Sequence, residues 1–167
     1  TTCNSYDGIA IDDVYIGEKP DEPTAIESEC FGNELVIDDV QTCSTSWLWD
    51  FGDPASGADN TSNLLTPSHF FSNPGQYTVT FTAFFDCRSP QITPFQLTIL
   101  GLEVNVTEPT CAGGDGVLEA IITNAPGPLN YAWNPIGINA SSISGLNAGT
   151  YILNVTGGPG VCPTGTM

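Results

Sequence analysis

The only imidazole in the chain belongs to His69, so any catalytic triad of the Ser-His-Asp type would have to use it. His69 directly precedes Phe70 and Phe71, and in that setting we expect its side chain to hold a loop. The sequence contains neither a G-x-S-x-G nucleophile elbow nor an H-E-x-x-H zinc motif. We therefore predict no catalytic residue and no enzymatic activity.

Three pairs of nearby carboxylates have the residue type that a glycoside hydrolase uses as its acid and base. The pairs are Asp12 with Asp13, Asp38 with Asp39, and Asp50 with Asp53. Adjacent residues on a strand point to opposite faces, so the first two pairs cannot converge unless a bulge intervenes. Asp50 and Asp53 flank Phe51-Gly52, and a short acid in such a turn commonly accepts backbone N–H bonds. Structural roles are therefore favoured for these carboxylates.

Calcium binding is the better functional hypothesis for the acidic residues, because Ca²⁺ takes about six to eight oxygen ligands and sandwich loops can supply them. The candidate ligands are Asp12, Asp13, Asp21 and Glu22 near a first module junction, and Asp50, Asp53 and Asp59 near a long loop. No EF-hand spacing is present, and the alternative is a set of solvated acidic loops. Apart from this structural calcium we predict no cofactor.

The charge balance excludes several classes of partner. Nineteen acidic side chains stand against two basic ones, Lys19 and Arg88, which gives a net charge of -17. Binding to nucleic acids or to anionic membranes depends on Lys and Arg, so neither partner is expected. The imbalance favours solubility and resistance to self-association outside the cell.

Hydrophobic periodicity predicts an all-β chain. From Tyr77 to Phe85, apolar side chains alternate with Gln76 and a run of threonines, which indicates a strand with one face in a core. Further strands are expected within 8–17, 34–40, 46–51 and 95–99, and after residue 118 at similar intervals. Short strands separated by turn signals are typical of tandem immunoglobulin-like β-sandwich modules. The expected division is a terminal strand with a linker (1–19), a first sandwich (20–101) and a second sandwich (102–167).

The two larger segments follow the same order of aromatic residues. In each, a tryptophan strand comes first, and a small-residue turn then leads into a strand that begins with tyrosine. A tyrosine in that place is expected to fill the edge of the core and to bond a nearby backbone group through its hydroxyl. We therefore predict that the cores are built around Trp49, Tyr77, Trp133 and Tyr151, with sugar stacking on the tryptophans as the weaker alternative.

The middle segment, about residues 24–101, resembles a PKD domain. The resemblance is carried by Trp49-Asp50-Phe51-Gly52-Asp53, by Pro67-Ser68-His69-Phe70-Phe71, and by Pro74-Gly75-Gln76-Tyr77-Thr78-Val79-Thr80. The glycine usual after the second aspartate is Pro54 here, and a longer loop follows it. The resemblance implies a seven-stranded sandwich that serves extracellular proteins as a spacer or contact module.

The last segment, about 102–165, resembles the SprB-type repeat of bacterial gliding-motility adhesins. The matching residues are Cys111-Ala112-Gly113-Gly114-Asp115-Gly116, Tyr131-Ala132-Trp133, the run 143–151 and the closing Cys162. Such repeats imply a large surface protein, often exported by type IX secretion. The opening strand, Gly8 to Gly17, is similar to the last strand of a MAM-like or laminin-G-like jelly roll. Any signal peptide has been removed or lies upstream.

Six widely spaced cysteines without a C-x-x-C pair favour disulfides in an oxidising compartment over a zinc site. Counting alone leaves 15 connectivities for six cysteines. With the two family resemblances in hand, we expect Cys30–Cys87 to tie the PKD-like sandwich and Cys111–Cys162 to close the adhesin-like repeat. Cys3 and Cys43 either pair with each other, or Cys3 has lost its partner with a preceding domain.

The first functional hypothesis is a non-catalytic, extracellular structural or adhesive segment of a large bacterial cell-surface protein or surface filament. Its partners would be other domains or copies of the same protein, with the opening strand completing a neighbouring sheet by β-strand complementation. The second is an accessory region, a spacer or carbohydrate-binding part, of a secreted hydrolase whose catalytic domain lies elsewhere. The third is a calcium-dependent module that binds glycans.

Overall fold

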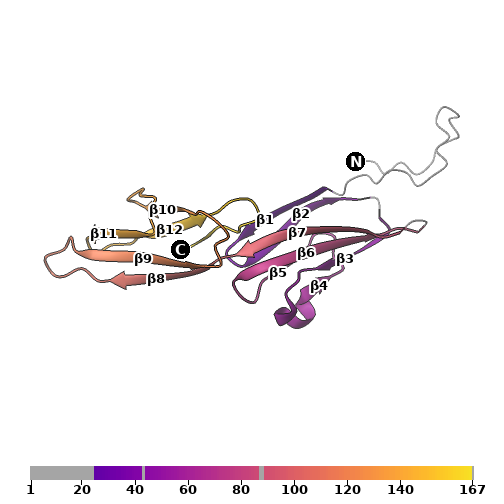
Figure 1. The fold of residues 1–167 in the computed structure, drawn as a ribbon, viewed down its shortest axis with the longest axis horizontal. Helices are drawn as coiled ribbons and strands as arrows, with labels where there is room; N and C mark the ends of the chain where they lie inside the picture. The colour runs from indigo at the N-terminus through magenta and orange to yellow at the C-terminus, as the bar shows by residue number, and fades with distance from the viewer. Residues whose placement is uncertain (1–24, 43, 87–88, 167) are drawn as a thin grey trace, which may run out of the picture.

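The computed structural model describes residues 25–42, 44–86 and 89–166. Antiparallel strands in four sheets make up most of this part of the chain, which confirms the all-β, immunoglobulin-like prediction. The strands form two sandwiches that lie end to end along the long axis of the molecule (Figure 1). The expected strand from Gly8 to Gly17 and the linker after it lie outside the described residues.

The first module consists of strands β1 to β7. One sheet has the order β1-β2-β5, formed by Ala25–Phe31, Glu34–Gln41 and Ser68–Phe70. The other has the order β4-β3-β6-β7, formed by Thr61–Ser62, Ser46–Asp50, Gly75–Phe84 and Gln91–Ile99. Sheets of three and four strands give the seven-stranded sandwich that the family resemblance implies.

Strand β6 shows why these residues fold as they do. Val79, Phe81 and Ala83 are completely buried, and the threonines between them lie on the other face of the sheet. Burial of alternate apolar side chains fixes the register, because a slip by one residue would put all of them in water. Pro94 lies in the neighbouring β7, which is the edge strand of its sheet, so the missing N–H of proline is tolerated there.

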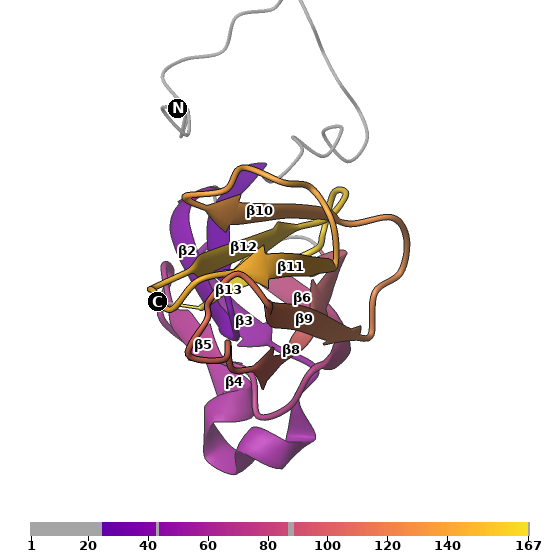
Figure 2. The ribbon, with the colours of Figure 1, turned by 90° about the vertical axis from the view of Figure 1, so that its left-hand side faces the viewer.

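The second module consists of strands β8 to β13. One sheet has the order β11-β9-β8, formed by Ser142–Leu146, Gly116–Thr123 and Gly101–Thr107. The other has the order β10-β12-β13, formed by Asn130–Asn134, Ile152–Thr156 and Thr164–Gly165. Figure 2 shows these sheets in front of the first module, with a helical segment of the first module projecting to one side.

Each module has its own hydrophobic core around one tryptophan. Trp49 is completely buried in the first core and Trp133 is 2% exposed in the second, in agreement with the alternation seen in the sequence. The indole N–H of Trp49 donates to the carbonyl of Leu65 (3.3 Å), and that of Trp133 donates to the carbonyl of Ala140 (2.9 Å). Both tryptophans therefore act as core residues, and neither offers a face for stacking on sugars.

The two tyrosines make the same local contact in the two modules. The hydroxyl of Tyr77 donates to the carbonyl of Asn73 (2.6 Å), and the hydroxyl of Tyr151 donates to the carbonyl of Asn147 (3.0 Å). Each acceptor lies four residues before its tyrosine, and each ring packs half-buried against the core of its module. The bond thus ties the preceding turn to the start of a core strand, as expected for a tyrosine corner.

Replacing Tyr77 or Tyr151 with phenylalanine removes this hydrogen bond and keeps the ring. We expect each variant to lose about 1 kcal/mol in the free energy of unfolding, the usual contribution of one such bond. Urea unfolding followed by tryptophan fluorescence measures the loss. Tyr131→Phe is the matched control, because Tyr131 also packs against the second core but its hydroxyl makes no hydrogen bond within the described residues. Equal losses in all three variants would contradict the assignment of the corners.

Candidate functional site

His69 and Asp53, two of the residues considered for catalysis or metal binding, meet inside the first module. The Nε2 atom of His69 on β5 lies 3.4 Å from Oδ2 of Asp53, and the two residues are only 3% and 2% exposed. The imidazole stacks on Phe51 with ring centroids 4.2 Å apart and meets Phe71 edge-on at 4.7 Å. The pair is enclosed by aromatic rings, so this geometry suits a structural contact between β5 and the loop after β3.

Hydrogen bonds keep the carboxyl group of Asp53 ionised. Burial by itself raises the pKa of Asp53, but the backbone N–H of Ser72 (2.8 Å) and the nearby His69 favour the carboxylate. The balance places the pKa of Asp53 below its ordinary value of 3.8. Burial, and then the charge of Asp53, in turn raises the pKa of the Tyr77 hydroxyl. A negative charge is thus fixed beneath the loop that links β5 to β6.

Asp50, the last residue of β3, also accepts hydrogen bonds from the loop that follows. Oδ1 of Asp50 accepts the backbone N–H of Gly52 (2.9 Å) and the side-chain amide of Asn60 (3.1 Å). Oδ1 of Asn60 accepts the N–H of Asp53 (2.5 Å), which closes the loop around the 3₁₀ segment η1 (Pro54–Asn60). Asp50 and Asp53 therefore organise a turn, as their spacing predicts.

Among the residues that the structure describes, no three or more His, Cys, Asp or Glu side chains gather in a group that could hold a metal ion. Asp59 is exposed on η1, while Asp50 and Asp53 are engaged in the loop. The remaining calcium candidates, Asp12, Asp13, Asp21 and Glu22, lie outside the described residues.

Asp38 and Asp39 lie at a β-bulge, which the sequence does not reveal. The register between β1 and β2 shifts where Glu27 pairs with Asp39 and Ser28 pairs with Ile37, which leaves Asp38 as the extra residue. Both carboxylates are exposed to solvent. A general acid in glycoside hydrolysis requires a desolvated carboxyl group, which this exposed pair does not provide.

The junction between the modules is held by two separate segments of the described chain. Only Leu100 separates β7 from β8, and its buried side chain belongs to the second core. After β12 the chain contacts the first module again, at residues 160–163. Thr98 on β7 donates its N–H to the carbonyl of Gly160 (2.7 Å) and accepts the N–H of Cys162 (3.0 Å), which forms a parallel bridge between Thr98 and Val161.

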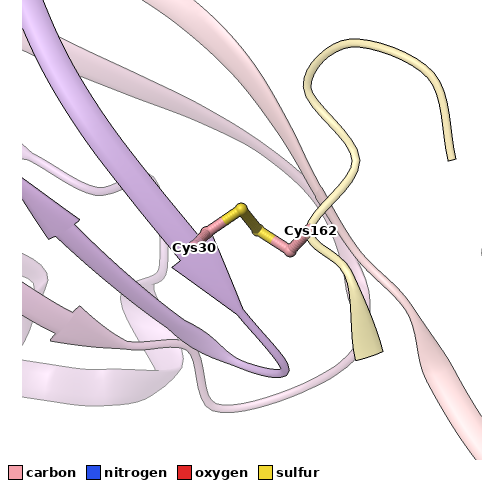
Figure 3. Close-up of a disulfide and its surroundings, with 2 residues drawn as sticks. All are labelled: Cys30 and Cys162. Carbon is pink, nitrogen blue, oxygen red and sulfur yellow. A yellow bond between two sulfur atoms is a disulfide. The ribbon is translucent and has the colours of Figure 1, made fainter. Parts of the chain in front are cut away.

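A disulfide between Cys30 and Cys162 fixes the returning segment to the first module (Figure 3). Cys162 is completely buried and belongs to the core of the first module, although 132 positions separate it from Cys30. Next to the disulfide, the N–H of Gly32 in the β1–β2 turn donates to the carbonyl of Pro163 (2.7 Å). The segment Gly160–Pro163 therefore contacts β7 in one sheet and β1 with its turn in the other sheet of the same sandwich.

Two glycines allow the backbones to approach closely at the junction. Gly160 has φ of +75°, and a Cβ atom there would lie 2.9 Å from the carbonyl oxygen of Gln96. A Cβ atom on Gly101 would collide with the Thr123 hydroxyl and lie 3.2 Å from Cγ of Pro74. A side chain at Gly160 would push the returning segment away from β7, and one at Gly101 would have to displace the Thr123 hydroxyl and press against Pro74 of the first module.

Residues 27–91 match the PKD domain family. The match runs from β1 to the first residue of β7 and covers most of the first module. PKD domains are typically non-catalytic structural modules found outside the cell. A search of curated proteins found none that matches the chain. No helix in the described part of the chain has the length and apolarity needed to cross a bilayer.

The predicted cysteine pairs require correction. Cys30 pairs with Cys162, so the expected bonds Cys30–Cys87 and Cys111–Cys162 are both wrong. Cys111 is a free, exposed thiol in the β8–β9 loop. The prediction assumed that each module closes on itself, whereas Cys162 enters the core of the first module. Cys87 and the predicted pair Cys3–Cys43 lie outside the described residues.

The Asp53→Asn variant tests the buried carboxylate through the pH dependence of stability. Because the folded-state pKa lies below 3.8, the stabilisation is complete above about pH 4 and is lost as the pH falls through the folded-state pKa. We expect the difference in unfolding free energy between wild type and variant to be widest near neutral pH and to shrink below pH 4. Urea unfolding at a series of pH values measures it, with exposed Asp59→Asn as a control for the lost charge. A difference that is the same at all pH values would contradict this role.

The disulfide assignment predicts the result of peptide mapping without reduction. Digestion of the folded protein should yield one linked peptide pair containing Cys30 and Cys162. The double variant Cys30→Ser/Cys162→Ser should lose roughly 4–5 kcal/mol of stability, since the bond closes a very long loop. Cys111→Ser should change stability little, because that thiol is exposed and free. Recovery of a Cys30–Cys87 pair would show the assignment to be wrong.

Proposed function

We propose that this chain is a non-catalytic structural and adhesive segment of a large bacterial cell-surface protein, or of a surface filament built from such proteins. The observation that carries the proposal is the junction. Neighbouring domains joined by small, polar interfaces normally move relative to each other. Here a one-residue connection, a strand bridge and a disulfide hold a PKD domain and a second sandwich together, which suits a stiff spacer.

The surface charge supports an extracellular setting. Among the Asp, Glu, Lys and Arg side chains that the structure describes, all are carboxylates, because Lys19 and Arg88 lie outside the described residues. Such a surface repels copies of itself and suits a protein that must stay soluble and resist unspecific association. Contacts with partners would then depend on strand pairing or on apolar contacts more than on ion pairs.

The second module supports the link to gliding-motility adhesins through the residues that carry the resemblance. In the β8–β9 loop, Gly113 and Gly114 both have positive φ, and the N–H of Thr110 donates to Oδ1 of Asp115 (2.8 Å). This hydrogen bonding lowers the pKa of Asp115. The glycines and the aspartate of the motif are therefore the residue types that this loop conformation requires. On this basis we propose that the second module is a SprB-type repeat, exported by type IX secretion.

Strand complementation is the proposed mode of contact with neighbouring copies or domains. Strand β1 is the outer strand of the β1-β2-β5 sheet within the described residues, so one of its edges is open to a further strand. The strand predicted from Gly8 to Gly17 is the element that we propose to add to such an edge in a neighbour. Glycans are the alternative ligands.

Antibodies raised against the folded chain test the location. We expect them to label intact, unpermeabilised cells of the source bacterium, and labelling only after permeabilisation would refute an extracellular role.

In the same parent protein, the segment is then replaced by a flexible Gly/Ser linker of equal length. Adhesion or filament formation should fall several-fold while surface labelling persists, because stiffness is lost without loss of export. The control replaces it with an unrelated pair of rigid sandwiches, which should preserve the spacing. Full function with the flexible linker would refute the structural role.

A further inference from the structure

The Cys30–Cys162 disulfide lies close to both ends of the described chain, which determines how the chain responds to a pulling force. Cys30 lies in β1, the first strand that the structure describes, and Cys162 lies shortly before the last described residue. Ala25 to Glu29 precede the bond and Pro163 to Thr166 follow it. Nearly all of both sandwiches therefore lies inside the loop that the disulfide closes.

We propose that the Cys30–Cys162 bond transmits tension along the chain and keeps both sandwiches off the path of the force. This inference rests on the proposed structural role, in which the chain is pulled from both ends. A pulling force follows the shortest covalent path, which runs from β1 through the two sulfur atoms to Pro163. Residues 31–161 are then not stretched, and their strands do not have to resist shear.

The segment that the disulfide protects from stretching is long. The cysteines are 132 positions apart in sequence and 5.2 Å apart between Cα atoms. An extended chain spans about 3.3–3.6 Å per residue, so unfolding of this loop under force would release roughly 430–470 Å beyond the folded separation. With the disulfide intact, only the short segments outside the bond can lengthen.

The surroundings of the bond favour this role. Cys162 is completely buried in the first core, which restricts access of reductants to its sulfur. The hydrogen bond between Gly32 and Pro163 and the bridge between Thr98 and Val161 flank the disulfide on two different sheets. The force therefore acts at the end of the first sandwich where residues 160–163 are hydrogen-bonded to β7 of one sheet and to the β1–β2 turn of the other.

The segments outside the bond have limited room to lengthen. At the carboxyl-terminal side, β13 pairs with β12, and the N–H of Thr166 donates to the carbonyl of Leu153 (2.9 Å). At the amino-terminal side, Ala25 to Glu29 pair with β2. Peeling of these few residues is the only extension that the described chain permits before a covalent bond breaks.

Single-molecule pulling on the full 167-residue chain, with handles at both ends, tests the proposal. The oxidised protein should show no unfolding step approaching 430 Å at forces that unfold ordinary β-sandwiches. Wild-type protein incubated with TCEP until the bond is reduced, and then pulled, should instead release roughly 430–470 Å, in one or two steps. This arm uses the folded wild-type protein and does not depend on any variant folding.

Two variants complete the experiment. Cys30→Ser/Cys162→Ser, pulled with TCEP present so that no other disulfide restrains it, should unfold with the long release from the first pull. Cys111→Ser should behave as the oxidised wild type, because its thiol is free. A long release from oxidised wild type, or loss of protection in Cys111→Ser, would overturn the proposal. Surface labelling is independent of these results, so a failure of the proposed location is distinguishable from a failure of the mechanical role.

Discussion

The return of the chain to the first module at Gly160–Pro163 is the constraint on which the rest of the structure depends. Thr98, in an edge strand, has its N–H and C=O satisfied by Gly160 and Cys162, and a buried disulfide fixes the same segment to the opposite sheet. Because the returning segment contacts both sheets, it closes the end of the first sandwich and sets the orientation of the second. Without it, the backbone at Leu100 would be the one covalent link between the two modules within the described residues.

The acidic surface limits which interactions can stabilise the fold. Ion pairs between Lys or Arg and carboxylates cannot stabilise the described region, because it contains neither Lys nor Arg. The free energy of folding must then come from apolar burial around Trp49 and Trp133, from hydrogen bonds, and from the disulfide. The tyrosine corners add one satisfied hydroxyl to each module at the turn before a central strand. This set of contacts does not depend on attraction between surface charges, which salt would screen.

Local patterns were sufficient to predict β2, β3, β6 and β7, the two tryptophan cores and the tyrosine contacts, since each depends on residues close in sequence or on simple alternation. Strands β1, β5 and β8 were not predicted. The cysteine pairing could not be predicted in this way. Six cysteines allow many pairings, and the correct one joins residues 132 positions apart across a module boundary that no local pattern marks. The bulge at Asp38 and the contact of Asp53 with His69 were hidden for the same reason, because both depend on which strands meet.

A disulfide between modules has a different physical effect from one within each module. Bonds inside the modules would stabilise two separate sandwiches and leave their relative orientation to one residue of backbone. The observed bond restricts the unfolded chain over both modules at once, so neither can open fully without affecting the other. It also leaves Cys111 free and the second module closed by packing alone. The two modules are thereby held in a fixed relative orientation, which the proposed spacer role requires more than it requires two independently stable domains.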